Sequence, residues 1–434
     1  MNLNISKLFA GTSFLTLSNI VSSAVGFIIS VLVARHYGAS VVGNIATVSS
    51  VVTLLSMVAL LGTDTLALKV MNRVSGKRQY FQVYRKLLSI CFIGIGLVAI
   101  ISIFVVGFTE FKFKEIMPYK ELVILMTVLA VIHKLNFNVL RGGGDLVYYA
   151  TVDIVSSSVL LLFIVAAIYV DIKGSLLPFF YAIPFVVSIL YSTLAFSRIT
   201  LPFGKTCEKS SELLKEKFTK ILSTSLPMLG STIGFTVIST VDILMLNNYH
   251  SSDAAGVYSI YIRLLLVITI VVNSANSLLA PQLSKLFHSN RHDDLKQYAK
   301  RSTLMVFALC SVPAIILFLF DENILRLFGE EFQSETIALH LLILGIMINA
   351  FFGATGFFLN MTNHEKEFFV IMFLAAFVNI IFNILLIPSY KAIGAALSSL
   401  LTICFWNIAS TLLIKKKCGY TLIYTSKIQS FFRY

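Results

Sequence analysis

A few charged side chains interrupt long apolar segments of this 434-residue sequence, and they are the residues best placed to do chemistry. The deepest cation is Arg263, which lies roughly 12 Å from the start of its segment at about 1.5 Å per helical residue. Its guanidinium is a planar fork of N–H donors that matches phosphate oxygens, so Arg263 could hold an anionic ligand. A structural ion pair with Asp242, near the end of the preceding segment, is an equally simple explanation.

Three carboxylates share this placement within or at the ends of apolar segments: Asp242, Asp153 and Asp64. A carboxylate that has lost its water can take up and release a proton near neutral pH, so these residues could couple transport to H⁺ or Na⁺. Lys134, with His133 beside it, forms an inner-mouth set with Asp153 and Asp64. The alternatives are snorkelling of Lys134 and Asp64 to the interface, and a pairing or capping role for Asp242.

Hydroxyl and small side chains form a stripe along the first apolar segment. Spacings of three and four residues place on one helical face Thr12, Thr16, Asn19, Ser23, Gly26 and Ser30. The stripe largely recurs about half a chain later, at Ser225, Thr232, Thr236 and Ser239. Because polar stripes are rarely turned toward lipid, they predict two helices that line a polar cavity. Close helix packing through small residues is the alternative.

Two further motifs give weaker indications of ligand binding. Arg141 precedes three glycines, Gly142 to Gly144, whose amides could form an anion-binding nest beside the guanidinium. A flexible turn explains the same residues, since no phosphate-loop Lys-Ser/Thr follows. His288 and His292 have a spacing that can hold a metal, but no third ligand accompanies them. Neither motif predicts a metal or cofactor site.

The composition places these residues in a membrane protein. Hydrophobic residues make up 57% of the chain and charged residues 13%, against about 25% charged in an ordinary soluble domain. No nucleophile elbow, dinucleotide-binding fingerprint or Cys-His site is present, and the five cysteines are too scattered for a disulfide framework or zinc site. An enzyme is therefore not expected.

Apolar runs of helical length predict an all-α integral membrane protein with twelve transmembrane helices. The spans lie near residues 8–34, 41–66, 87–108, 121–140, 148–170, 176–196, 221–247, 255–280, 303–320, 336–359, 368–387 and 393–414. Lys and Arg gather in the loops 69–86, 198–220 and 281–301 and in the tail, which places these loops and both termini in the cytoplasm. The net charge of +13 thus reflects membrane topology, and nucleic acid is excluded as a partner.

The two halves of the chain repeat each other. Gly43 and Gly256 occupy matching positions between the first two spans of each half, and Gly174 matches Gly394 later on. Six spans per half give both halves the same orientation, so the repeat is parallel. The predicted domains are an N-terminal six-helix bundle (1–197), a cytoplasmic linker (198–220), a C-terminal six-helix bundle (221–414) and a tail (415–434). This tail suits either the inner membrane interface or a loose chain end.

Several segments resemble a known family. They are Leu32 to Gly38 leading to Gly43, Ser225 to Met228 with Asp242 to Leu246, Ala255 to Ser259, Pro281 to Ser284, and Asn383 to Pro388 with Gly394 to Ala396. They resemble the lipid-linked oligosaccharide flippases of bacterial surface polysaccharide synthesis, in the superfamily that also holds the MATE drug exporters. The resemblance implies two six-helix bundles around a central cavity, and alternating access.

The resemblance also implies a substrate and a location. The substrate would be an oligosaccharide repeat unit, of O-antigen or another surface polysaccharide, on undecaprenyl pyrophosphate. It would move from the inner to the outer leaflet of the bacterial inner membrane, with the polysaccharide polymerase and membrane lipids as partners. Arg263 best fits the family's anion-binding cavity residues, together with Lys134 and Arg141. Few cavity cations favour a neutral repeat unit.

Two other functions remain open from the sequence. A cation-coupled multidrug antiporter of the same fold would need a carboxylate on its first span, where this chain has Asn19 but no Asp or Glu. An integral membrane glycan polymerase or acyltransferase would need a large outer loop or a catalytic His/Arg/Asp set, and the predicted outer loops are short.

Overall fold

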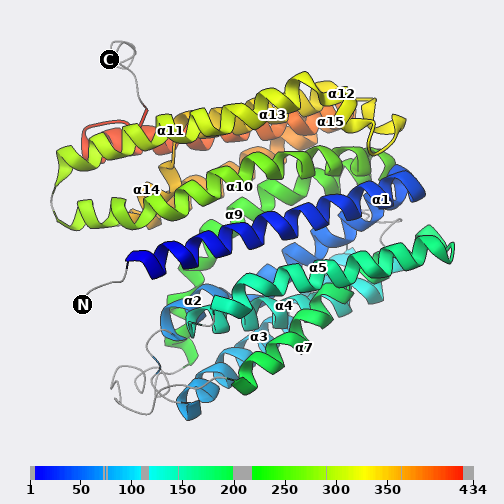
Figure 1. The fold of residues 1–434 in the computed structure, drawn as a ribbon, viewed down its shortest axis with the longest axis horizontal. Helices are drawn as coiled ribbons and strands as arrows, with labels where there is room; N and C mark the ends of the chain where they lie inside the picture. The colour runs from blue at the N-terminus through cyan, green and yellow to red at the C-terminus, as the bar shows by residue number, and fades with distance from the viewer. Residues whose placement is uncertain are drawn as a thin grey trace. The chain divides into compact units, whose positions relative to one another are not determined.

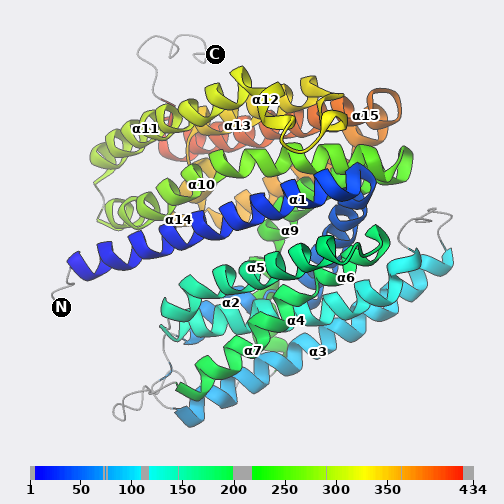
Figure 2. The ribbon, with the colours of Figure 1, turned by 45° about the vertical axis from the view of Figure 1, so that its right-hand side comes forward.

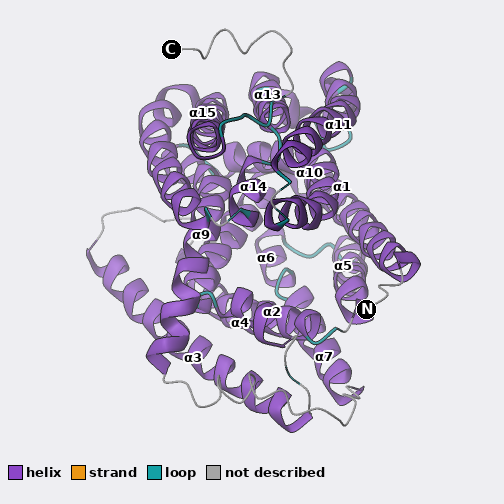
Figure 3. Ribbon diagram, turned by 90° about the vertical axis from the view of Figure 1, so that its left-hand side faces the viewer, coloured by secondary structure: helices purple, strands orange, loops and turns teal. Residues whose placement is uncertain are grey.

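The computed structural model describes residues 5–71, 74, 77–108, 117–144, 146–198, 218–289, 291–362 and 364–423, and in this part of the chain every regular element is a helix (Figure 3). The α-helices are α1 Ile5–Leu60, α2 Thr63–Met71, α3 Lys77–Phe108, α4 Lys120–Gly142, α5 Leu146–Tyr169, α6 Leu177–Phe180, α7 Ile183–Arg198, α9 Phe218–Tyr249, α10 Ser252–His288, α11 His292–Leu319, α12 Asp321–Leu325, α13 Thr336–Phe352, α14 Thr355–Met361 and α15 Glu365–Cys418. Three short 3-10 helices, η1 Met117–Tyr119, η2 Gly174–Leu176 and η3 Glu330–Gln333, lie between them.

Length and hydropathy identify a multi-pass membrane protein. Among the described residues, eight helices are long and apolar enough to cross a bilayer, or nine if α13 and α14, bent by 40° at their junction, form one span. Lipid offers no hydrogen-bond partners to the backbone, whereas a helix pairs its own amides and carbonyls. Helices are therefore expected for a chain with this apolar composition. The predicted all-α membrane class is confirmed. The count of twelve spans, the two parallel bundles and the cytoplasmic termini stay predictions.

Two helices are long enough to cross a bilayer twice. α1 has 56 residues and α15 has 54, which is roughly 80 Å at 1.5 Å per residue, against about 30 Å of hydrocarbon. Each contains one non-helical residue near its middle, Gly38 (φ 79°, ψ 176°) and Lys391 (φ 49°, ψ −129°). These residues lie where the sequence predicts loops between successive spans.

Three spans that the hydropathy pattern predicts as continuous helices are interrupted in the structure. The span 41–66 is interrupted at Leu61 and Gly62, which have positive φ values of 51° and 74°. The span 336–359 is interrupted at Gly353, with φ 80°, and the span 176–196 at a turn between α6 and α7. A hydropathy profile does not detect such breaks, because the residues at which the helix is interrupted are mostly apolar or small.

The chain divides into two compact units, Met1–Gly256 and Val257–Tyr434, which we call unit 1 and unit 2. In unit 1, α4 packs against α1, α2, α3, α5 and α7. The helices α3, α4, α5 and α7 run side by side in Figures 1 and 2. In unit 2, α15 packs against α13 and α14, and α11 packs against α13. The predicted linker 198–220 lies almost wholly outside the described residues, and the predicted domain division stays a prediction.

The two glycines that the internal repeat aligns lie against each other inside unit 1. A methyl group on Gly43 would overlap the carbonyl of Ser252, and one on Gly256 would overlap the carbonyl of Ala39. Ala39 and Ser252 each precede their glycine by four residues, so the contact is symmetric under the repeat. Such small-xxx-small crossings let helix backbones touch in a membrane. Two side-chain hydrogen bonds flank it, from Asn247 to Thr47 at 2.7 Å and from Ser252 to Asn44 at 3.0 Å.

We expect Gly43→Ala to destabilise the protein by about 1–3 kcal/mol, because the new methyl group meets backbone that has no rotamer to move into. Gly96→Ala on α3 is the matched control, since a methyl group there has nothing within 4 Å. Thermal unfolding of the purified variants in detergent measures the difference. Equal melting temperatures for the two alanine variants would contradict the crossing.

Candidate functional site

Polar side chains of α4 fill the interior of unit 1. Asn136 is 3% exposed and donates to the Ser192 hydroxyl of α7 at 2.8 Å, while Tyr84 of α3 donates to its amide oxygen at 2.8 Å. One asparagine thus joins three helices. A buried amide with both ends hydrogen-bonded fixes the relative position of its neighbours, because each broken bond would leave a polar group unsatisfied.

The adjacent turn of α4 makes a second set of contacts. His133 Nδ1 lies 2.6 Å from the Ser188 hydroxyl of α7, and the Tyr148 hydroxyl of α5 lies 3.3 Å from the same oxygen. The His133 ring also packs beside the rings of Phe137 and Phe185. His133 is therefore turned toward α7 and the aromatic core of unit 1.

The structure brings together part of the predicted inner-mouth set. Lys134 Nζ lies 3.0 Å from the hydroxyl of Ser56 on α1, and the Asp64 carboxylate at the start of α2 acts electrostatically on the same ammonium. Asp153, half-buried on α5, belongs to a different neighbourhood and acts electrostatically on Tyr148. An electrostatic interaction thus links Lys134 to Asp64, and another links Asp153 to Tyr148.

The prediction that the polar stripes line a cavity stays a prediction, and the described stripe residues differ in exposure. Asn19 and Thr232 are exposed within the structure, and Ser23 and Thr236 are half-buried. Their helices, α1 and α9, contact each other. The Thr236 hydroxyl donates to the Thr232 carbonyl at 3.0 Å, so its hydrogen bond is made within its own helix. The side chains of the stripe residues Thr12, Thr16 and Ser225 lie outside the described part.

Asp242 and Arg263 belong to different units. Asp242, on α9 of unit 1, is 2% exposed and has a polar interaction. Arg263, on α10 of unit 2, is half-buried and also has an interaction of its own. Their pairing and their roles in anion binding and ion coupling stay predictions.

The glycines after Arg141 end a helix instead of forming an anion nest. The amide of Gly143 donates to the Val139 carbonyl at 2.9 Å, and the amide of Gly144 donates to the Arg141 carbonyl at 3.1 Å. Gly144 has φ +86°, which suits glycine at the end of a helix. These two amides are therefore unavailable to a ligand, which favours the turn interpretation. The Arg141 side chain itself is exposed.

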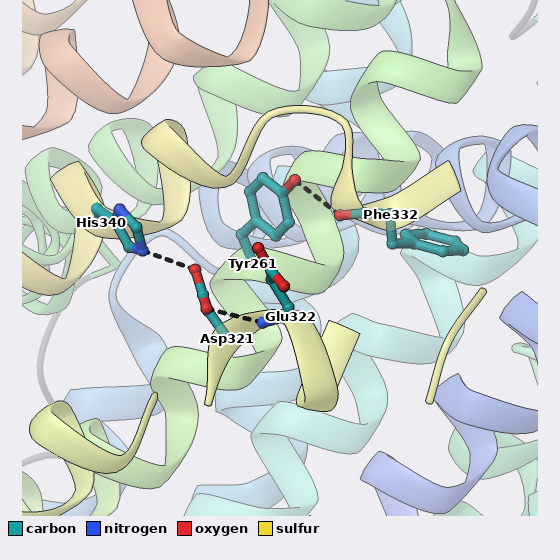
Figure 4. A network of polar contacts seen from close by, with 5 residues as sticks. All are labelled: Tyr261, Asp321, Glu322, Phe332 and His340. Atoms are coloured by element: carbon teal, nitrogen blue, oxygen red, sulfur yellow. Dashed lines mark hydrogen bonds and ion pairs between the residues drawn. The ribbon is translucent and has the colours of Figure 1, made fainter. Parts of the chain in front are cut away.

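Sequence reasoning missed a polar network in unit 2 (Figure 4). His340 Nε2 lies 2.8 Å from Asp321 Oδ2, and Asp321 Oδ1 accepts the Glu322 amide at 2.8 Å. The buried Tyr261 hydroxyl donates to the Phe332 carbonyl at 2.8 Å. The network ties the segment 321–335 to α10 and α13. Neither His340 nor Tyr261 could be singled out from the sequence, because a single histidine or tyrosine in a span carries no spacing signal.

Within the described residues, no group of three or more His, Cys, Asp or Glu side chains could hold a metal ion. The side chains of His288 and His292 are not among those described. What the described residues do offer is a polar interior in unit 1, a buried carboxylate on α9 (Asp242) and a half-buried guanidinium on α10 (Arg263).

The family is shown by the sequence. Residues 8–287 match the family described as "Polysaccharide biosynthesis protein", and residues 227–385 match the MatE family. The capsular polysaccharide biosynthesis protein CapF of Staphylococcus aureus is 26% identical over 188 residues, which is 42% of this chain and 46% of CapF. The matched stretch thus spans about half the length of that relative.

Solved structures share the fold. The lipid II flippase MurJ, in an inward closed conformation, matches with a TM-score of 0.68 and 15% identity over 92% of this chain and 87% of that chain. An inward-facing multidrug resistance MATE family transporter of the MOP superfamily matches with a TM-score of 0.73 and 14% identity over 92% and 94%.

The fold of this chain is thus shared with solved structures of a flippase and of MATE family transporters. Since the first match covers well over half of the sequence, the chain belongs to the family of polysaccharide biosynthesis proteins. The resemblance found in the sequence is confirmed at this level.

We expect Asn136→Ala to lower the free energy of unfolding by about 1–3 kcal/mol, since it leaves the Tyr84 hydroxyl without its acceptor and removes the hydrogen bond to Ser192. Asn138→Ala, two residues along α4, is the control, because Asn138 donates only to the Lys134 carbonyl of its own helix, at 3.1 Å. Thermal unfolding in detergent compares the two. An Asn136→Ala protein as stable as Asn138→Ala would contradict the three-helix junction.

Proposed function

We propose that this protein is a flippase for oligosaccharide repeat units linked to undecaprenyl pyrophosphate. The repeat units pass from the inner to the outer leaflet of the bacterial inner membrane by alternating access, for O-antigen or another surface polysaccharide. The observation that carries the proposal is the family match over residues 8–287, which includes both polar stripes. The MurJ fold supports it, because MurJ is a flippase for a lipid-linked substrate.

We assign the lipid head group to basic residues on the cytoplasmic route and in the cavity. Arg263 is the principal candidate, because its guanidinium can bind two pyrophosphate oxygens at once. Arg141, exposed at the end of α4, is suited to a first contact. Neutral sugars would face the hydroxyl and amide side chains of Asn19, Ser23, Thr232 and Thr236. The polysaccharide polymerase would receive the product in the outer leaflet.

The cycle needs a driving force, which we assign to H⁺ or Na⁺. Asp153 lies within a helix that is long and apolar enough to span a membrane, and Asp242 lies in the predicted span 221–247, so neutralising either carboxylate would change the cost of its burial. Such a change can favour one of two conformations and so couple an ion gradient to transport. Asp64, which interacts with Lys134, is the weakest of the three candidates.

A multidrug antiporter is the second candidate, and the match to the MatE family over residues 227–385 favours it. The first span argues against it, since it carries Asn19 and no carboxylate. A cation exporter needs an acidic group that its substrate and the coupling ion can share. A polymerase or acyltransferase has less support, because the chain has the family and the fold of transporters.

Deleting the gene from its native host tests the function. We expect complete single repeat units on undecaprenyl pyrophosphate to accumulate on the cytoplasmic side while surface polysaccharide disappears, as measured by mass spectrometry of extracted lipids and by gel analysis of the polysaccharide. Normal polysaccharide with new sensitivity to cationic drugs would instead identify the antiporter.

Substitutions at Arg263 test the anion site in the same strain. Arg263→Ala should abolish complementation, whereas Arg263→Lys should retain part of it, because the charge remains and the two-pronged geometry is lost. Arg326→Ala, at an exposed arginine after α12, is the matched control for losing a basic residue. Full polysaccharide production by Arg263→Ala, at wild-type protein levels, would remove Arg263 from the site.

A further inference from the structure

The second half of α1 continues into α2 through a break that directly follows the candidate span Leu17–Leu60. α1 ends at Leu60, and both Leu61 and Gly62 have positive φ before α2 begins at Thr63. The Thr63 hydroxyl donates to the Leu60 carbonyl at 2.6 Å and takes the place of one lost backbone bond. In a membrane protein a broken helix is tolerated where protein groups satisfy its ends.

Negative charge converges on this break from both sides. The C-terminal end of a helix is partly negative because its peptide dipoles align, and this holds for the end of α1 although the Val58 carbonyl accepts the Leu61 amide and the Leu60 carbonyl accepts the Thr63 hydroxyl. Ser56, fully buried in the turn before that end, donates to the Thr53 carbonyl at 3.0 Å, so its oxygen lone pairs remain available. Asp64 adds a carboxylate in the first turn of α2. Together these groups provide the oxygen-rich surroundings that a cation needs.

The ammonium of Lys134 supplies that cation. It lies 3.0 Å from the Ser56 hydroxyl and interacts electrostatically with Asp64. The neighbouring His133 is turned away, toward Ser188 on α7, so it brings no competing donor. α4 thereby contacts both helices that meet at the break.

The packing around the break is tight enough to hold these groups in place. Gly94 of α3 approaches Ala59 so closely that a methyl group on the glycine would overlap the Ala59 carbonyl. On the other side of the break, a methyl group on Gly142 of α4 would lie 3.0 Å from the Met71 side chain and 3.1 Å from the Ala67 carbonyl. Backbones that touch in this way leave the α1–α2 junction little freedom.

We propose that the break between α1 and α2 is a built site for a monovalent cation, and that the chain fills this site with its own lysine. Lys134 is then a positioning residue: its tethered ammonium fixes the inner part of the second span against α4 and does not leave during a transport cycle. It binds neither substrate nor coupling ion. Removing the side chain should open a site for a small free ammonium ion.

Chemical rescue of Lys134→Ala tests this site. n-Propylammonium has the three carbons and the nitrogen that the substitution removes. In detergent, the variant should melt several degrees below the wild type, and millimolar n-propylammonium should restore most of that loss. 1-Propanol, of similar size but neutral, should restore none. Lys120→Ala, at the exposed start of α4, and the wild type should respond to neither compound.

Lys134→Met keeps the apolar stem and removes only the charged group. It therefore tests the cation site even if the alanine variant does not fold. It should gain stability from ammonium ions and not from 1-propanol. Lys134→Arg should melt at a higher temperature than Lys134→Ala and Lys134→Met. Equal responses of the variants and the wild type to the amines, or rescue by 1-propanol as well, would overturn the cation site. This stability measurement needs no substrate, so its outcome is independent of the proposed flippase activity.

Discussion

The constraint on which this structure depends is that lipid offers no hydrogen bonds to the backbone. A chain this apolar can satisfy its amides and carbonyls only within helices, and every interruption has to be met by another protein group. The break after Leu60 is met by the Thr63 hydroxyl, and the end of α4 is met by the amides of Gly143 and Gly144. Polar residues inside unit 1 are therefore placed where helices end, bend or cross.

The same constraint separates two kinds of polar residue in this protein. Asn136, Ser192 and Tyr84 are committed to one another inside unit 1 and act as structural joints. The stripe residues Asn19 and Thr232 remain exposed on the surfaces of α1 and α9. A transporter for a bulky glycan needs both kinds: rigid bodies that keep their shape, and polar surfaces that a sugar can contact. The proposed flippase mechanism uses the second kind and relies on the first.

The sequence predicted the membrane class, most of the spans and the family, because these depend on composition, periodicity and motifs spread over many residues. It also aligned Gly43 with Gly256, although nothing in the repeat revealed that the two glycines would touch. The breaks at Leu61 and Gly353 were not predictable, since a hydropathy profile does not register backbone dihedral angles. The partner of Lys134 was equally hidden, because Ser56 is 78 residues away and is one of many serines in apolar segments.

Direct flipping by the purified protein is the measurement that tests the central claim. The protein would be reconstituted into vesicles with an undecaprenyl-pyrophosphate-linked oligosaccharide, and the fraction of glycan accessible to an added glycosidase would be followed over time. We predict that the protein raises accessibility from about half toward completion, with an Arg263→Ala protein much slower. Accessibility that stays at the level of protein-free vesicles, with and without a proton or sodium gradient, would contradict the flippase account.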